Sequence, residues 1–383
     1  MSMSAPIDLV LTAIALAGVF VALSGVSQTK RPSIVADRLR VLYGLLAAFF
    51  SLRLLNLLLP TAFSNGATLL VAAWLPFAQL RLAEDIVRFH AAKWVKLFTL
   101  IGALALSVLT LLSGFVPSAA VLIGLALYQI SATVFVILLL RAHRRDVSGA
   151  DRGLADTFVL ALLLVAPLAL TDFRELFADA PVRGGAFAVL VLVLATSHFV
   201  SGHGKPSLLL RDIGISGAAG AILGVLMLVS APSLGFATGI QIMACGVATT
   251  GLILLLERFA TDQRASSGLV HALAQVSHRS DRASLLEAHP LLSQGRLLDG
   301  PVLADYPEDT IRSLLSYPIL TGQTGPEALR DATRDLLDRY AATHLVRVTV
   351  EPPQLLAISA GELAGPSLDD DLALVARLIE GAR

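Results

Sequence analysis

Residues 118–140 read SAAVLIGLALYQISATVFVILLL without one charged side chain, and the chain continues with Arg141, Arg144 and Arg145. The hydrocarbon core of a bilayer is about 30 Å thick, and a helix needs about 20 apolar residues to cross it. Backbone groups in lipid must find their hydrogen bonds within the segment, which favours a helix. This stretch is therefore predicted to be a transmembrane helix with a basic flank.

The same pattern recurs along the first two thirds of the chain. It predicts an all-α polytopic membrane bundle of about nine transmembrane helices over residues 1–257, followed by a small cytoplasmic α+β domain. The predicted spans are residues 6–26, 41–63, 67–87, 96–116, 118–140, 153–172, 184–203, 213–232 and 235–257.

Composition excludes several classes of protein. Hydrophobic residues make up 55% of the chain and charged residues 15%, far from the usual balance of a soluble domain. The formal net charge is zero, so no basic field that would bind nucleic acid is expected. The single cysteine, Cys245, excludes an intrachain disulfide and a cysteine-based zinc cluster. Residues Met1 to Pro6 lack the basic region of a signal peptide, so we expect a retained first anchor.

Basic residues in the short loops predict the orientation. They are concentrated after the first, third, fifth and seventh predicted spans, whereas the alternate loops contain little beyond Arg174 and Arg183. Basic loops stay on the cytoplasmic side. We therefore expect an extracytoplasmic N-terminus and a cytoplasmic tail. The basic loop residues are Lys30, Arg31, Arg38, Arg40, Lys93, Lys96, Arg141, Arg144, Arg145, Arg152, Lys205 and Arg211.

Polar side chains within the predicted spans are the candidates for a ligand or relay site. Arg53 lies near the middle of the second span, and Asn56 follows three residues later on the same helical face. A charge at this depth is costly unless it is paired, so Arg53 either packs structurally in the bundle or serves a ligand or relay. The other candidates are Tyr128, Gln129, His198 and Gln241, each of which could instead join neighbouring helices by hydrogen bonds.

The end of the third span carries four charges, Arg81, Glu84, Asp85 and Arg88. Their i,i+4 spacing predicts Arg81–Asp85 and Glu84–Arg88 pairs on a solvated helix end.

No enzymatic signature is complete. Gly204 and Lys205 look like part of a phosphate-binding loop, but Phe199 stands where the motif requires glycine. No histidine or carboxylate lies three or four residues from His198 to form a metal-ligand pair. The sequence therefore predicts no enzyme activity, no metal site and no cofactor.

The last third of the chain is predicted to hold a linker helix over residues 258–290, continuous with the ninth span, and a small α+β domain over 291–383. In that domain the pattern predicts a helix after Pro326, strands at 344–350 and 355–359, and a final helix capped by Ser367. One face of the first of these helices carries Leu329, Thr333, Leu336, Leu337 and Tyr340.

Leu273 to His278 resembles the phosphoacceptor helix of bacterial sensor histidine kinases, where a Ser-His pair follows a short apolar stretch. Arg279 occupies the place of that family's acidic residue, and the glycine-rich ATP boxes are missing. The resemblance implies a phosphoacceptor role for His278, and the alternative is a plain exposed histidine. The helix, hairpin and closing helix of the tail resemble the end of a GAF-type sensory domain.

Residues 1–205 resemble the multi-helix sensory regions at the N-terminus of bacterial histidine kinases and related membrane regulators. The resemblance rests on Trp74-Leu-Pro-Phe with Glu84 and Lys96, and on the run from Leu154-Ala-Asp-Thr-Phe to Thr171-Asp-Phe-Arg174. It implies a seven-helix sensory unit to which residues 213–257 add two helices.

Topology and resemblance together predict an integral membrane signalling protein of a bacterial inner (plasma) membrane, whose tail acts by contact with a cytoplasmic signalling protein. A small-solute transporter with a regulatory tail is the first alternative, and a degenerate histidine kinase without an ATP-binding domain is the second. The lipid bilayer is the expected environment, no nucleic-acid partner is expected, and the sequence leaves a homodimer open.

Overall fold

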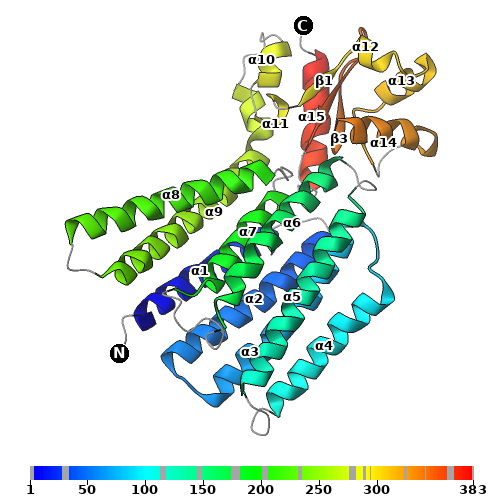
Figure 1. Ribbon diagram of the computed structural model, residues 1–383. Coiled ribbons are helices and arrows are strands. Elements are labelled where there is room, and N and C mark those ends of the chain that lie inside the picture. Colours follow the sequence, from blue (N-terminus) through cyan, green and yellow to red (C-terminus); the bar gives the residue numbers. More distant parts are fainter. Residues whose placement is uncertain are drawn as a thin grey trace.

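The computed structural model shows a bundle of helices with a small α+β tail at one end of it (Figure 1). It describes residues 4–27, 34–112, 118–144, 149–173, 182–200, 206–231, 235–275, 282–287, 290–293, 295–322, 326–340, 342–359 and 366–381. The bundle comprises α1 (Ser4–Ser27), α2 (Ile34–Leu58), α3 (Ala62–Val87), α4 (Lys93–Leu111), α5 (Ser118–Ala142), α6 (Gly149–Leu170), α7 (Gly185–Val200), α8 (Pro206–Ser230) and α9 (Phe236–Gln275).

Eight of these helices are long and apolar enough to cross a membrane, which indicates a multi-pass membrane protein. They correspond to eight of the nine predicted spans. The remaining span, 184–203, corresponds to α7, which is apolar but only 16 residues long. A helix of this length reaches about 24 Å, less than the bilayer core. Residues 201–205 lie outside the described ranges.

The turn between α2 and α3 corrects two predicted boundaries. The second span was predicted at 41–63, but α2 ends at Leu58, shortly before Pro60. Thr61 then caps α3, because its side chain accepts a hydrogen bond from the Ser64 N–H at 3.1 Å. The Thr61 N–H donates in return to Ser64 Oγ at 3.3 Å. This capping box starts α3 at Ala62, earlier than the predicted residue 67.

The bundle core lies between helices that are distant in sequence. Helix α1 packs on α2, α7 and α9, whereas α3 packs on α2, α4, α5 and α6. Large side chains such as Tyr43, Phe50 and Phe158 are fully buried there. Helix α4 lies at one edge of the bundle and α8 at the other (Figure 1).

Helix α8 approaches α9 closely through small residues. Its buried positions include Asp212, Ser216, Gly220 and Gly224, which repeat every four residues along one face. Gly246 of α9 meets this face, and a Cβ on it would lie 3.1 Å from the Gly220 Cα. Close backbone approach through small residues is a common way to join transmembrane helices.

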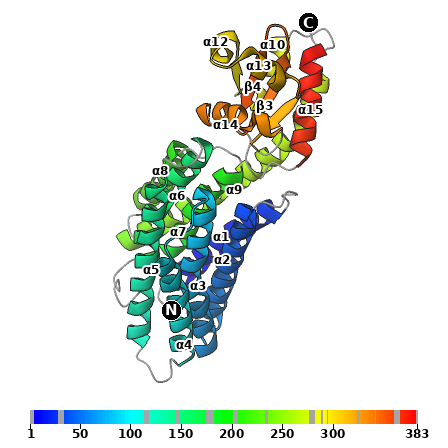
Figure 2. The ribbon, with the colours of Figure 1, turned by 90° about the vertical axis from the view of Figure 1, so that its right-hand side faces the viewer.

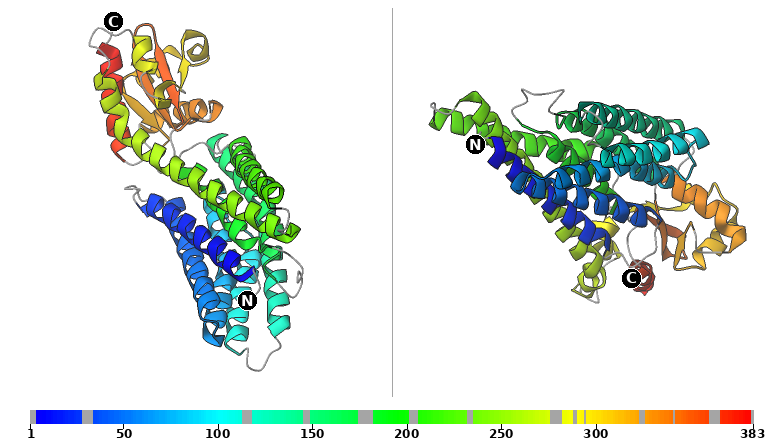
Figure 3. Two further views of the ribbon diagram at one scale, coloured as in Figure 1. Left: turned by 90° about the vertical axis from the view of Figure 1, so that its left-hand side faces the viewer. Right: turned by 90° about the horizontal axis from the view of Figure 1, so that it is seen from below.

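Helix α9 is 40 residues long, or about 60 Å, and leaves the bundle to reach the tail (Figure 3). It continues beyond the apolar stretch into the polar residues Thr261, Asp262, Gln263 and Arg264. Helix α9 thus extends past residue 257, the predicted end of the last span, as far as Gln275, into the segment 258–290 where the linker helix is predicted. Residues 276–281 lie outside the described ranges.

The tail is built on a four-stranded antiparallel sheet of order β1-β4-β3-β2. Helix α15 covers one face, and α13 and α14 lie on the other (Figure 2). The described tail elements are α10 (Arg282–Glu287), α11 (Pro290–Ser293), β1 (Arg296–Leu298), α12 (Gly300–Leu303), α13 (Glu308–Leu315), β2 (Ile319–Thr321), the 3₁₀ turn Glu327–Leu329, α14 (Arg330–Arg339), β3 (His344–Thr349), β4 (Gln354–Ile358) and α15 (Pro366–Gly381).

Alternation along β3 and β4 divides the tail core in two. Val346 and Ile358 pack against α15, whereas Leu345 and Leu355 pack against α13 and α14. The predicted hairpin and closing helix are present, but α15 begins at Pro366, so Ser367 lies inside the helix and is not its cap. Leu329, Thr333, Leu336 and Leu337 of the predicted face are buried, and Tyr340 is partly buried. Strands β1 and β2 were not predicted, because three residues are too few to show alternation.

We expect residues 282–383 to fold without the bundle, because helices from the same segment cover both faces of the sheet. Circular dichroism and a cooperative thermal transition of this fragment would check it. Leu372→Ala should destabilise the fragment by about 2 to 5 kcal/mol, since Leu372 is fully buried. Leu374→Ala on the same helix is the control, because Leu374 is 42% exposed. A fragment without a cooperative transition would contradict the expectation.

Candidate functional site

Arg53, the predicted intramembrane charge, is buried in an ion pair with Asp172. Nη2 of Arg53 donates to Asp172 Oδ1 at 3.2 Å, and Nη1 contacts Oδ2. Arg53 is 8% exposed. The sequence prediction did not identify Asp172 as a partner, although its position at the end of a predicted span was an available signal. The pair joins α2 to the segment that connects α6 and α7.

Two glycines bring the start of α7 onto Asp172. The Gly185 N–H donates to Asp172 Oδ1 at 3.2 Å, and the Gly184 N–H donates to Thr171 Oγ1 at 2.7 Å. A Cβ on Gly185 would lie 1.9 Å from Asp172 Oδ2, so a larger residue would displace the carboxylate. Beside them, Arg183 Nε lies 3.2 Å from Asp8 Oδ2 of α1. We call Asp8, Arg53, Asp172 and Arg183 the distal cluster, because it lies away from the tail.

Asn56 does not join Arg53 in one site. Its Oδ1 accepts a hydrogen bond from Ser64 Oγ at 2.7 Å, so Asn56 belongs to the α2–α3 turn. One turn of helix therefore separates a buried ion pair from a capping interaction.

The Arg53–Asp172 pair should show strong energetic coupling. Arg53→Gln and Asp172→Asn are each expected to destabilise the protein by about 2 kcal/mol, because each leaves a buried charge without its partner. The double variant should lose about 1 to 2 kcal/mol less stability than the sum of the two single variants. Unfolding in detergent micelles would measure this. The exposed Arg144–Asp156 pair is the control, and its coupling should stay below about 1 kcal/mol.

The other predicted ligand residues are distributed over several helices. Tyr128 donates to the Thr99 carbonyl at 2.7 Å, and Gln129 donates to the Ala72 carbonyl at 3.3 Å. These bonds join α5 to α4 and α3. Gln241 is buried on α9, and His198 belongs to α7 with its side chain outside the described part of the structure. The structure thus places Tyr128 and Gln129 as links between helices.

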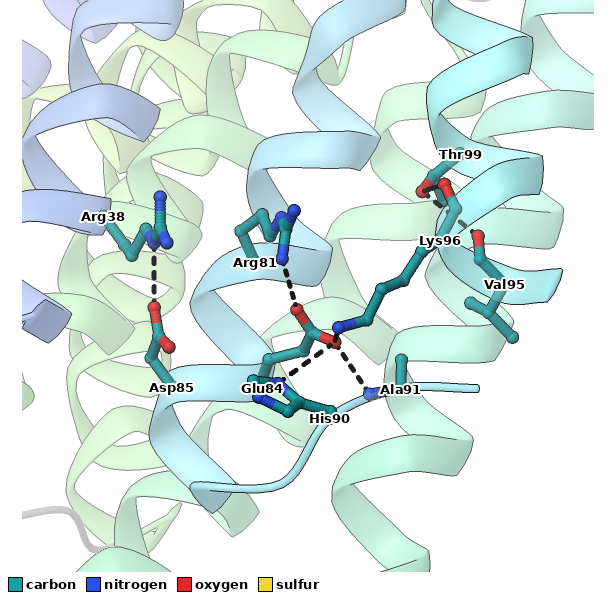
Figure 4. Close-up of polar contacts among 9 residues, drawn as sticks. All are labelled: Arg38, Arg81, Glu84, Asp85, His90, Ala91, Val95, Lys96 and Thr99. Atoms are coloured by element: carbon teal, nitrogen blue, oxygen red, sulfur yellow. Dashed lines mark hydrogen bonds and ion pairs between the residues drawn. The ribbon is translucent and has the colours of Figure 1, made fainter. Parts of the chain in front are cut away.

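Glu84 is the centre of a second cluster (Figure 4). It lies near the end of α3, on the side of the bundle that faces the tail (Figure 1). Its side chain is 2% exposed and lies 2.7 Å from Lys96 Nζ and 3.1 Å from Arg81 Nη1. It also accepts a hydrogen bond from the Ala91 N–H at 2.7 Å, and His90 Nδ1 lies 4.0 Å away. Helix α3, helix α4 and their connecting loop therefore converge on one buried carboxylate.

This arrangement shows that the predicted Arg81–Asp85 pair at the end of α3 is wrong. Arg81 contacts Glu84 rather than Asp85, and Asp85 accepts from Arg38 Nε of α2 at 2.8 Å. Helix α3 ends at Arg88, whose backbone is in the left-handed region with φ 53°. The chain then turns back and carries Ala91 and Lys96 to Glu84. We call Arg38, Arg81, Glu84, Asp85 and Lys96 the proximal cluster.

A third polar group lies where α9 leaves the bundle. Arg258 of α9 contacts Asp212 of α8 through Nη2, and its Nη1 donates to Ser197 of α7 at 3.2 Å. Asp212 is 1% exposed and Ser197 fully buried. Helices α7, α8 and α9 are therefore joined at the point where α9 leaves the bundle toward the tail. We call Ser197, Asp212 and Arg258 the junction.

In the tail, His344 of β3 is buried and joins two elements. Its Nε2 lies 2.9 Å from Asp369 Oδ1 of α15, and its Nδ1 lies 2.8 Å from Thr343 Oγ1. His344 is 5% exposed, and it connects the sheet to its covering helix α15.

The opposite side of the tail carries a polar surface group. Tyr306 donates to Asp335, and Arg339 contacts Asp305 at 2.8 Å and Asp335 at 3.4 Å. Burial and the Asp335 acceptor raise the pKa of Tyr306 to about 12, so this phenol stays protonated at neutral pH.

Comparison with known proteins adds no assignment. Neither a family model nor a curated protein nor a solved structure matches this chain. Within the described residues, no three His, Cys, Asp or Glu side chains gather as metal ligands. His278, the predicted phosphoacceptor, lies outside the described residues.

Proposed function

We propose that this chain is an integral membrane signalling protein that passes a change in its helical bundle to the tail through α9. The observation that carries the proposal is the junction. A single helix runs from the bundle to the tail, and a buried ion pair fixes it where it leaves. A change in α7 or α8 that alters this pair would move α9 and the tail with it.

The tail has a second link to the bundle, because α14 contacts α6 while α15 contacts α9. Elements with two packed arrangements, rather than a continuous deformation, carry such signals. The proposal places the tail in the cytoplasm and the N-terminus outside, following the basic loops. The tail would act by contact with a signalling protein, in keeping with the resemblance of residues 1–205 to sensory regions.

A distance measurement tests the coupling. Cys245 is the only cysteine, so Cys245→Ala allows spin labels at Ala142→Cys on α5 and Glu308→Cys on α13. Asp212→Asn should shift or broaden the distance distribution, because it weakens the hold on Arg258. Asp37→Asn is the control, since Asp37 pairs with Arg40 at the exposed surface. Identical distributions in all three proteins would contradict transmission through α9.

Partner capture tests the output. Crosslinking in native membranes should recover a signalling protein with the full chain and lose it when residues 258–383 are deleted. The transporter alternative predicts solute flux and no partner that depends on the tail. No tail-dependent partner, together with solute flux in proteoliposomes that Arg53→Ala abolishes, would contradict the signalling proposal.

A further inference from the structure

A pocket of about 240 Å³ lies between α2 and α3, next to the proximal cluster. Arg38 and Arg81 line it together with apolar side chains from both helices. The apolar lining residues are Val41, Leu45, Trp74, Phe77 and Ala78.

The polarity of the pocket changes along the helices. Val41 and Leu45 follow Arg38 by three and seven residues on α2, and Phe77 and Trp74 precede Arg81 by four and seven on α3. Seven residues of helix span about 10 Å. The arginines therefore lie at the helix ends, at the depth of lipid headgroups, and the apolar wall extends toward the bilayer core. This gradient matches one phospholipid, with its charged head outward and one acyl chain inward.

The charges at the rim favour an anion. Arg38, Arg81 and Lys96 face two carboxylates, Glu84 and Asp85, so three positive charges meet two negative ones. Arg38 contacts Asp85 through its Nε, and Arg81 contacts Glu84 through its Nη1. Other nitrogens of both guanidinium groups remain able to donate to a phosphate. The Arg81 guanidinium also lies 5.3 Å from the Phe77 ring, which holds it at the pocket wall.

We propose that this pocket binds an anionic phospholipid of the surrounding bilayer, with the phosphate between Arg38 and Arg81 and an acyl chain against Trp74 and Phe77. The inference does not depend on the signalling proposal. The carboxylates of the proximal cluster position the two arginines, and the predicted cytoplasmic leaflet is the one where anionic lipids attract basic residues.

Trp74 provides the probe, because the chain has only two tryptophans and Trp94→Phe leaves Trp74 alone. Full-length protein would be placed in phosphatidylcholine nanodiscs of two kinds, one containing brominated phosphatidylglycerol and the other brominated phosphatidylcholine. The bromine content of the two would be equal. The anionic lipid should quench Trp74 more strongly, and unbrominated phosphatidylglycerol should reverse the excess. Equal quenching by the two lipids would overturn the proposal.

Variants separate the pocket from general surface charge. Arg38→Gln or Arg81→Gln should each lower the preference for the anionic lipid about fivefold. Arg40→Gln removes the same charge from the same helix, yet Arg40 pairs with Asp37 and does not line the pocket, so the preference should persist. An equal loss in Arg40→Gln would overturn the proposal, and so would reversal of quenching by inorganic phosphate, which would indicate a soluble anion.

Discussion

Replacement of Glu84 by leucine is expected to destabilise the bundle by about 2 to 3 kcal/mol. Removing one partner of a fully buried ion pair costs about 3 to 5 kcal/mol, because the remaining charge stays buried without compensation. Here Lys96 and Arg81 are 27% and 36% exposed, so water would compensate part of that loss. The Ala91 N–H would also lose its acceptor, which loosens the loop between α3 and α4. Unfolding of the purified protein in detergent would measure the change.

Two further variants define what the Glu84 carboxylate contributes. Glu84→Gln should be less damaging than Glu84→Leu, because an amide oxygen can still accept from Ala91 and Lys96. Asp37→Asn should change stability by less than about 1 kcal/mol, since the Arg40–Asp37 pair is at the surface. If Glu84→Leu proved as mild as Asp37→Asn, the proximal cluster would have no structural role.

The residues around Glu84 show how far sequence reasoning reached. Apolar length located the helices, and alternation with turn residues located the β3–β4 hairpin, because both are local patterns. The charges at the end of α3 were recognised as well, but their partners were assigned by helical spacing alone. Arg81 in fact pairs with Glu84 three residues on in the same helix, and the other two partners, Arg38 and Lys96, come from other helices. Spacing within one helix carries no information about Arg38 and Lys96.

The same limit applies to Arg53 and to the junction. Arg53 was singled out by its depth, whereas Asp172 is 119 residues away in sequence and meets it only through the fold. Asp212 and Arg258 lie in stretches that read as ordinary span ends, and no local pattern relates them. Short strands β1 and β2 depend likewise on pairing with distant strands. Tertiary pairing therefore accounts for most of what the sequence did not predict.

Replacement of Gly220 by leucine is expected to separate α8 from α9, with a loss of stability of about 3 kcal/mol, the upper end for overpacking. A Cβ at this position would lie 2.6 Å from the Met243 carbonyl oxygen and 2.9 Å from the Val247 nitrogen. Both are backbone atoms of α9, so a change of side-chain rotamer cannot relieve the clash. Unfolding in detergent would measure the loss, and crosslinking between cysteines placed on α8 and α9 would report the separation.

Gly217 provides a matched control on the same helix, because a Cβ there would meet nothing within 4 Å. Gly217→Leu should be neutral or slightly stabilising, since leucine favours a helix more than glycine does. Equal effects at both positions would show that α8 does not depend on close contact with α9. Gly220 lies two helical steps of four residues from Asp212, on the same buried face. Gly220→Leu should therefore also pull Asp212 from Arg258 and change the tail distances as Asp212→Asn does, whereas Gly217→Leu should not.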